Sequence, residues 1–176
     1  MRRAVDADRV RAFMRALGLA ARGEHTVYLV GGATAVLEGW RDSTIDIDVA
    51  FPEGHGAEEL LRALPAIKDE LELNVELASP ADFVPVPEGW MERSPSIARE
   101  GSVSFLHYDL YAQALSKLER GHERDLRDVG EMLSRGLVDP DRLLDYFEEI
   151  QDELYRYPAI DPPSFRRRVE SALADL

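Results

Sequence analysis

Hydrophobic and polar residues alternate in several short segments of the first 109 residues, and this period of two predicts β-strands. The expected strands are residues 26–30, 45–51, 73–77, 97–100 and 103–108. In the second of these, the odd-numbered positions are all apolar: Ile45, Ile47, Val49 and Phe51. Because successive strand residues point to opposite faces, Asp46 and Asp48 are expected to share the other face.

Apolar residues spaced three and four apart predict helices between and after these strands. An N-terminal helix capped by Asp6 or Asp8 is expected to run to about Ala20. A short helix follows over 33–38, and another over 58–71 is expected to be interrupted at Pro65. The later helices are 110–120, 123–135, 140 to about 154, and one opened by Asp161-Pro162-Pro163. The pattern predicts a mixed α/β core over residues 1–109 and a helical part over 110–176 packed on it.

The charge of the chain limits the molecules it is suited to bind. It has 176 residues, 21 basic and 34 acidic side chains, and a formal net charge of −13. Residues 46–116 alone hold 4 basic and 14 acidic side chains, a net charge of −10. A broad nucleic-acid-binding face needs clustered Lys and Arg, so this balance disfavours one. The acidic middle is suited instead to metal cations or a cationic substrate.

Other features of the composition exclude several classes of protein. There is no cysteine, which excludes disulfides, thiolate zinc sites and cysteine nucleophiles. No apolar run approaches the ~18 residues of a membrane-spanning helix, and residues 1–6 do not form a secretory signal. We therefore expect a cytoplasmic protein with no membrane partner. The four histidines show no spacing typical of metal ligands, which predicts structural or exposed roles: His25, His55, His107 and His122.

The segment Asp46-Ile47-Asp48 is the first candidate for chemistry. Both carboxylates are predicted to point the same way, about 6.6 Å apart along one strand face. Ionised carboxylates at that distance repel, and a divalent cation would relieve the repulsion. Oxygen ligands without cysteine favour Mg²⁺ or Mn²⁺. The alternative is an edge strand on which water solvates both acids.

Gly31-Gly32 stands between a predicted strand and a predicted helix. Bare backbone N–H groups at such a turn suit phosphate, although a tight turn alone also explains a glycine pair. A short helix and a return fit between these glycines and Asp46. We therefore expect the turn and the acids to meet at the same end of adjacent strands. On the third strand, Glu76 is the candidate for a third metal ligand, with Glu72 as its competitor.

Three motifs, in this order, resemble the nucleotidyltransferase superfamily of DNA polymerase beta type. They are Leu29-Val30-Gly31-Gly32, then Arg41-Asp42-Ser43-Thr44-Ile45-Asp46-Ile47-Asp48, then Glu76. The chain is most similar to small bacterial toxins of the AbiEii/MenT type. The resemblance continues with Lys117 followed by Arg124-Asp125-Leu126-Arg127-Asp128. Two positions depart from the family: Glu76 replaces the usual Asp, and Gly-Gly replaces the Gly-Ser common elsewhere in the superfamily.

The resemblance implies a nucleotidyltransferase-like mixed sheet with flanking helices, and a role for each matched residue. Asp46 and Asp48 would hold Mg²⁺ on the triphosphate of an NTP. Glu76 would share a second ion and help to deprotonate the attacking hydroxyl. The amides of Gly31 and Gly32 would hold phosphate.

Further matched residues would contact the nucleotide or pin the loop before the strand. Arg41, Ser43 and Thr44 belong to this group, with both roles open. Lys117 would supply a mobile cation to the phosphates. Either Asp125 or Asp128, which share a helix face, would fix Lys117 or Arg41; the alternative is a solvated row of ion pairs.

The implied activity is transfer of a nucleoside monophosphate from an NTP to an acceptor hydroxyl. By resemblance the protein is a toxin that acts on tRNA, with a cognate antitoxin. The charge of −13 instead suits a protein acceptor or a cationic small molecule, as for an antibiotic-modifying adenylyltransferase. A catalytically silent nucleotide-binding or partner-binding module is the alternative from a different class.

Overall fold

The computed structural model describes residues 4–51 and 57–174. The chain divides into two compact units. The first takes Met1–Ser79 and Pro95–Tyr108, and the second takes Pro80–Ser94 and Asp109–Leu176. His55, one of the histidines considered above, lies outside the described residues, as do the first three residues of the chain. The division into functional domains at residue 109 remains a prediction.

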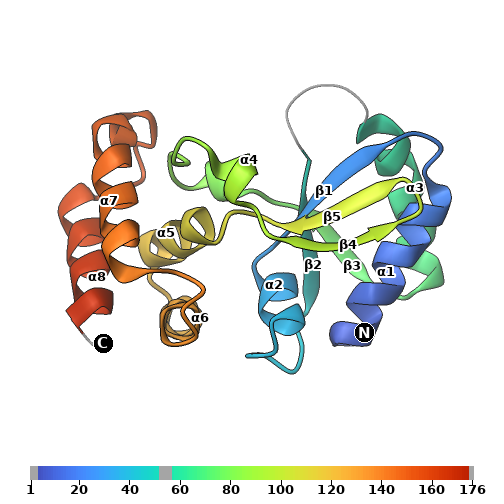
Figure 1. Ribbon diagram of the computed structural model, residues 1–176, viewed down its shortest axis with the longest axis horizontal. Coiled ribbons are helices and arrows are strands. Elements are labelled where there is room, and N and C mark those ends of the chain that lie inside the picture. The colour runs from blue at the N-terminus through green and yellow to red at the C-terminus, as the bar shows by residue number, and fades with distance from the viewer. Residues whose placement is uncertain (1–3, 52–56, 175–176) are drawn as a thin grey trace. The chain divides into compact units, whose positions relative to one another are not determined.

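The first unit is built on a five-stranded mixed sheet with the order β3-β2-β1-β5-β4 (Figure 1). The strands are β1 (His25–Val30), β2 (Asp46–Ala50), β3 (Asn74–Leu77), β4 (Ser96–Glu100) and β5 (Val103–His107). The pairs β1–β5 and β2–β3 are parallel, whereas β1–β2 and β4–β5 are antiparallel. All five strands occur where the sequence predicts them, and the mixed α/β fold class is confirmed.

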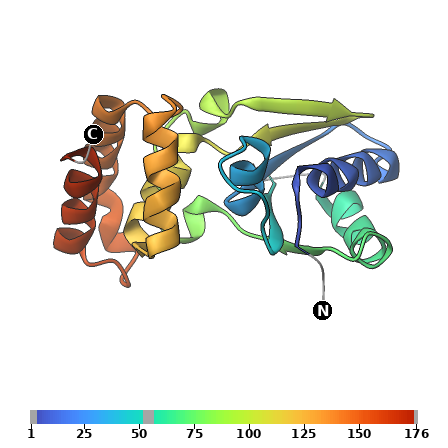
Figure 2. The ribbon, with the colours of Figure 1, turned by 90° about the horizontal axis from the view of Figure 1, so that it is seen from below.

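One face of this sheet forms the hydrophobic core of the first unit. Helices α1 (Ala7–Ala20) and α3 (Ala57–Glu70) lie together on one side of the sheet (Figure 2). Ile47 and Val49 of β2 are fully buried in the core cluster, whereas Asp46 and Asp48 on the opposite face are half-buried. The alternation of β2 thus divides it into a core face and a polar face, as the period of two predicts.

Two details of the first unit differ from the sequence predictions. Ile45 is 68% exposed and precedes β2, because the chain there is still turning out of the bridge between Val5 and Thr44. Pro65 does not interrupt α3, which is continuous through it. Proline inside a helix costs about 3 kcal/mol. The buried face of α3, with Leu60, Leu64 and Ile67, offsets that cost, while Pro65 itself faces solvent.

The second unit consists of helices around its own core. Its helices are α4 (Trp90–Arg93), α5 (Leu110–Arg120), α6 (Glu123–Ser134), α7 (Pro140–Ile150) and α8 (Pro162–Ala174). Two 3₁₀ segments accompany them, η1 (Pro80–Asp82) and η2 (Gln151–Arg156). The rings of Phe147 and Phe165 pack edge to face with centroids 4.9 Å apart, and both are buried. The helix predicted to reach residue 154 ends at Ile150, and η2 continues from it.

The proline-rich segment 80–94 packs with the helices of the second unit. Arg93 pairs with the buried carboxylate of Asp109 at 2.8 Å, and its guanidinium lies 4.3 Å from the centroid of the Tyr146 ring. It also donates to the backbone carbonyl of Glu88. One arginine therefore joins this segment to the N-terminus of α5 and to α7.

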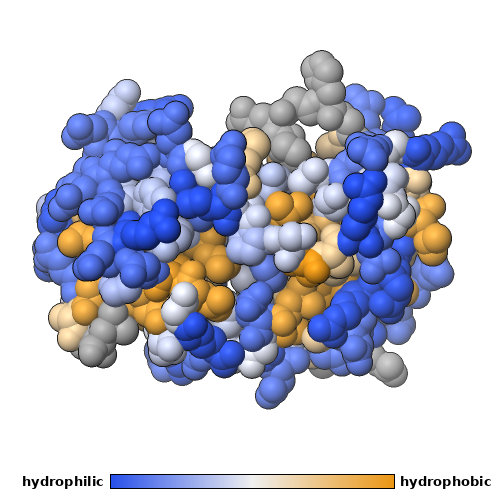
Figure 3. Space-filling view, viewed as in Figure 1, coloured by the Kyte–Doolittle hydropathy of each residue, from blue (hydrophilic) through white to orange (hydrophobic). Residues whose placement is uncertain are grey.

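The surface shows no sign of a membrane span. In the described ranges 4–51 and 57–174, no helix is both long and apolar enough to cross a bilayer. Figure 3 shows polar residues over most of the helical unit, with hydrophobic residues gathered toward the side where α5 and α6 lie.

Candidate functional site

The sharp turn between β1 and α2 (Gly32–Leu37) depends on two glycines, which we call the glycine corner. Gly31 has φ +62° and ψ −120°, a conformation that side chains of L-residues disfavour. A Cβ atom on Gly31 would also stand 3.0 Å from Oδ2 of Asp48. The corner therefore brings bare backbone directly against the second acid of the Asp-x-Asp strand.

Gly32 is required for a different reason. A Cβ atom there would stand 2.1 Å from Oγ1 of Thr44, closer than any real contact. Thr44 is held in place by backbone hydrogen bonds in both directions with Val5, at 2.8 and 2.9 Å. Thr44, predicted to contact the nucleotide or to pin the loop, is buried and packs its side chain against the glycine corner.

The acids lie on the same face of the sheet, at the end where the corner stands. In the β1–β2 pair, Val30 is opposite Asp48, so the turn and the Asp-x-Asp strand meet at one end of adjacent strands. In the parallel β2–β3 pair, Asp48 is opposite Glu76. Glu72 lies in the turn before β3 with φ +52°, so register places Glu76 and not Glu72 beside the aspartates.

An amide links two of these acids. Nδ2 of Asn74 donates to Oδ1 of Asp46 at 2.5 Å and to Oε1 of Glu76 at 2.9 Å. Asn74 stands opposite Asp46 in the parallel pair, which explains how one amide group reaches both carboxylates. The alternation of Asn74 with Glu76 was visible in the sequence, but only the strand register shows that it bridges two strands.

The donor chemistry of this face fits a hard divalent cation. Asp46, Asp48 and Glu76 offer only oxygen ligands, the type that Mg²⁺ and Mn²⁺ prefer. Their carboxylates are not arranged around one point. Among the residues that the structure describes, no group of three acidic or histidine side chains is placed to hold a metal ion. Asn74 holds Asp46 and Glu76 with a donor that a bound cation would replace. The three acids fit the ion in their type of ligand atom and in lying on the same face of the sheet.

Arg41 and Ser43, also predicted to contact the nucleotide, lie in the loop between α2 and β2. Both are half-buried. The backbone N–H of Arg41 donates to the carbonyl of Ala35 at 3.3 Å, which ties this loop to α2. Their position close to the corner in the chain is consistent with either of the two roles considered for them.

In the second unit, Lys117 is buried in a network of charged side chains. Its ammonium lies 2.6 Å from Oδ2 of Asp128 and 3.5 Å from Oδ1 of Asp125, and the residue is only 3% exposed. Arg120 pairs with the same oxygen of Asp125 at 2.8 Å. Both predicted aspartates therefore contact Lys117, and Arg120, for which the motif predicted no role, joins them. Two cations and two anions balance one another, as burial of charge requires.

Comparison with known proteins decides the family. A family model described as a nucleotidyltransferase of unknown function (DUF6036) matches residues 9–160. The chain belongs to this nucleotidyltransferase family. The match covers the glycine corner, the three acids, and Lys117 with its two aspartates. No curated protein and no solved structure matches the chain.

The family assignment is coarser than the resemblance seen in the motifs. It gives the general class of nucleotidyltransferase and leaves the AbiEii/MenT relationship, the acceptor and the metal as proposals. The matched region also includes the elements around the glycine corner.

One histidine predicted to be structural or exposed lies beside the glycine corner. His107 is the last residue of β5, is 3% exposed, and contacts Thr34 and Glu38 of the α2 region at 3.1 and 2.9 Å. Burial lowers the pKa of His107 below its ordinary value of 6.5, although the carboxylate of Glu38 opposes this. The only sequence signal for these contacts is a histidine at the end of an alternating strand.

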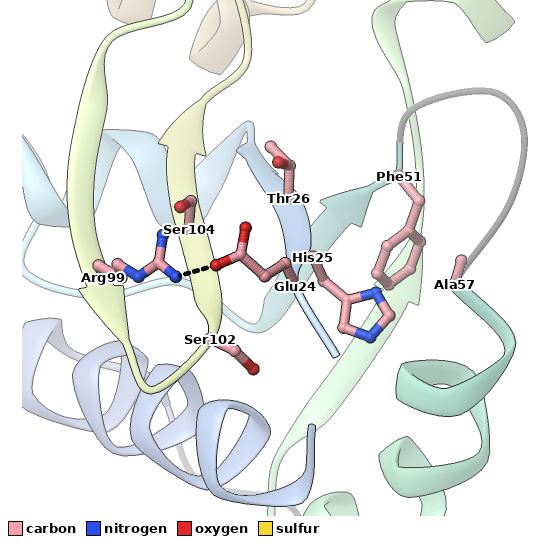
Figure 4. A pocket seen from close by; sticks show the side chains of 8 residues that line it. All are labelled: Glu24, His25, Thr26, Phe51, Ala57, Arg99, Ser102 and Ser104. Carbon is pink, nitrogen blue, oxygen red and sulfur yellow. Dashed lines mark hydrogen bonds and ion pairs between the residues drawn. The ribbon is translucent and has the colours of Figure 1, made fainter. Parts of the chain in front are cut away.

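A polar cavity of about 260 Å³ opens at the other end of β1. Figure 4 shows His25 on the side of Phe51 and Ala57, and Arg99 on the opposite side, where it pairs with Glu24 at 2.7 Å. Since Asp48 pairs with the last residue of β1 and the cavity lies at its first residues, the cavity is separate from the glycine corner.

Proposed function

We propose that this family member is a Mg²⁺-dependent nucleotidyltransferase that moves a nucleoside monophosphate from an NTP to an acceptor hydroxyl. The observation that carries the proposal is that the glycine corner and Asp48 lie next to each other. Bare backbone suited to phosphate stands against a carboxylate suited to a metal, and that combination is what binding of a metal–triphosphate complex needs.

The residues of the sheet face would divide the work. Asp46 and Asp48 would hold Mg²⁺ or Mn²⁺, and Glu76 would complete the set. When bound, the ion would neutralise charge on the phosphates and lower the barrier to transfer. The corner amides of Gly31 and Gly32 would orient a phosphate. These roles rest on the shared face and register of the three acids together with the family assignment.

The proposed reaction forms one bond and breaks one. The acceptor hydroxyl oxygen bonds to the α-phosphorus of the NTP, and the bond from that phosphorus to the bridging oxygen of the β-phosphate breaks. The hydroxyl proton passes to the carboxylate of Glu76, and pyrophosphate leaves. Glu76 is exposed, so an acceptor can reach it from solvent.

Lys117 is the residue of the second unit that the resemblance assigns to the phosphates. Its local support is the presence of two carboxylates that hold the ammonium in one position. A positioned cation loses less entropy on meeting a phosphate than a free side chain does. The two aspartates would thus act as positioning residues for Lys117.

Two observations favour different acceptors. The resemblance to AbiEii/MenT toxins favours a tRNA end, with a cognate antitoxin as partner. The net charge of −13 favours a cationic small molecule, such as an aminoglycoside, or a protein acceptor.

The test is transfer of label from each of the four NTPs in the presence of Mg²⁺. Label on the α-phosphorus should appear on total RNA, on a protein or on an aminoglycoside, whereas label on the γ-phosphorus should leave as pyrophosphate. Asp48→Asn should abolish transfer by removing a metal ligand while the fold persists. Asp8→Asn, an exposed aspartate in the first turn of α1, is the matched control and should transfer normally.

Each outcome has a definite meaning. Transfer that is unchanged in Asp48→Asn refutes the site. NTP binding by the wild-type protein without transfer to any of the three acceptors favours the catalytically silent module. Transfer of the γ-label would instead indicate a kinase-type reaction.

A further inference from the structure

A single imidazole ring contacts both ends of α2. Nδ1 of His107 lies 3.1 Å from Oγ1 of Thr34, near the start of the helix. Nε2 lies 2.9 Å from Oε1 of Glu38, the residue that caps the helix at its C-terminus. Because α2 has only six residues, these two contacts reach from its first turn to its C-terminal cap.

Each ring nitrogen of His107 has its own polar partner. The carboxylate of Glu38 accepts hydrogen bonds, so Nε2 of His107 donates to it. Nδ1 faces the hydroxyl of Thr34 at 3.1 Å. The carbonyl of Leu29 accepts the Thr34 hydroxyl at 3.3 Å and the backbone N–H of Tyr108 at 2.9 Å, so Thr34 is itself held to the end of β1.

The position of α2 matters because the helix begins at the glycine corner. The site for a Cβ atom on Gly31 is 3.0 Å from Asp48, and that on Gly32 is 2.1 Å from Thr44. Packing this close leaves no free space at the corner. A small shift of α2 would therefore change the distance between the corner amides and the Asp48 carboxylate.

We propose that His107 is a positioning residue that holds α2, and with it the glycine corner, in place beside Asp48. Its consequence for nucleotide binding rests on the proposed function, whereas its effect on α2 does not. A plain core position at the end of β5 would need only an apolar side chain. The two directional contacts, to Thr34 and Glu38, are what distinguish His107 from such a position.

The first measurement is backbone amide exchange in α2. His107→Phe keeps a ring of similar size and removes both polar contacts. We expect the amides of Ala35, Glu38 and Gly39, which close the turns of α2, to exchange about tenfold faster or more. His107→Gln keeps a donor near the position of Nε2 and should restore much of the protection through Glu38.

The second measurement is the kinetics of the proposed transfer. A displaced corner should weaken NTP binding, so His107→Phe should raise KM for the NTP about tenfold while kcat changes much less. His107→Gln should lie between this variant and the wild type. A residue with a purely structural role would lower the amount of folded enzyme and leave KM unchanged.

A matched control is available in the same unit. His25 makes a similar contact with a carboxylate, 2.8 Å from Glu59, at the opposite end of β1. His25→Gln should leave α2 exchange and the KM for NTP unchanged. If His25→Gln moved both quantities as His107→Phe does, the effect would be one of global stability and the inference would be wrong.

The remaining outcomes separate this inference from the proposed function. If the wild type transfers no nucleotide, the proposed function fails, and amide exchange still decides the role of His107 in holding α2. If the wild type is active and His107→Phe changes neither exchange nor KM, only the inference on His107 is overturned. Should His107→Phe not fold, Thr34→Val combined with Glu38→Ala replaces it, and unchanged exchange in that variant overturns the inference equally.

Discussion

Gly32 lies so close to Thr44 that a side chain at position 32 would overlap the threonine side chain. A Cβ atom on Gly32 would stand 2.1 Å from Oγ1 and 2.8 Å from Cβ of Thr44. The bridge between Thr44 and Val5 fixes the threonine from the other side. The loop before β2 and the start of α2 are therefore locked together at the glycine corner.

Gly32→Ala should destabilise the protein because the added methyl group overlaps Thr44. Overpacking of this kind costs about 1–3 kcal/mol. Thr44→Gly, combined with Gly32→Ala, removes both overlapping atoms and should recover part of that loss as a favourable coupling energy. Urea unfolding of the two single variants and the double variant measures it.

A glycine in the second unit serves as the control for this prediction. Gly130 lies within α6, and a Cβ atom there would meet nothing within 4 Å. Gly130→Ala should therefore stabilise the protein by about 1 kcal/mol through helix propensity. Equal effects of Gly32→Ala and Gly130→Ala would contradict the steric explanation.

The buried pair of Lys117 and Asp128 should be costly to break from one side. Asp128→Asn leaves the ammonium of Lys117, at 2.6 Å, without its principal negative charge. Loss of one partner of a buried pair costs about 3–5 kcal/mol. Chemical denaturation should show this loss, which Asp125 lessens because it is also near Lys117 at 3.5 Å.

The exposed pair of Arg127 and Glu123 on α6 is the comparison for that measurement. Glu123→Gln should change the free energy of unfolding by no more than about 0.5 kcal/mol, because solvent screens surface pairs. If Asp128→Asn proves as mild as Glu123→Gln, then Lys117 finds water or another partner in solution, and the buried network is not as described.

Glu59 should make stability depend on pH in the acid range. The hydrogen bond from His25, together with backbone N–H groups of Arg22 and Gly23, lowers the pKa of Glu59 below 4.5. A carboxylate whose pKa is lower in the folded state stabilises that state above its unfolded pKa. This contribution should therefore disappear as the pH falls below about 4.5.

Glu59→Gln should flatten the fall in melting temperature between about pH 5 and pH 3, relative to the wild type. Its neighbour Glu58 is exposed and pairs only at the surface with Arg62, so Glu58→Gln should leave the slope as it is. A wild-type slope in Glu59→Gln would show that His25 does not stabilise the charged carboxylate.

Local pattern alone determined much of the first unit. The alternation in β2 separates Ile47 and Val49 from Asp46 and Asp48, because side-chain direction follows from the backbone period. The glycine pair marked the turn that leads into α2. The order of turn, helix and Asp-x-Asp strand predicted that the turn and the acids would lie at the same end of adjacent strands, and the strand pairing has Val30 opposite Asp48.

The tertiary structure decided which residues from distant parts of the chain meet. Register places Glu76, and not Glu72, opposite Asp48, and makes Asn74 a link between Asp46 and Glu76. It also joins Lys117 to two aspartates at once and His107 to both ends of α2. Periodicity reports only which way a side chain points along its own element. Its partners depend on how elements pack, and that is fixed by burial of the whole core rather than by local sequence.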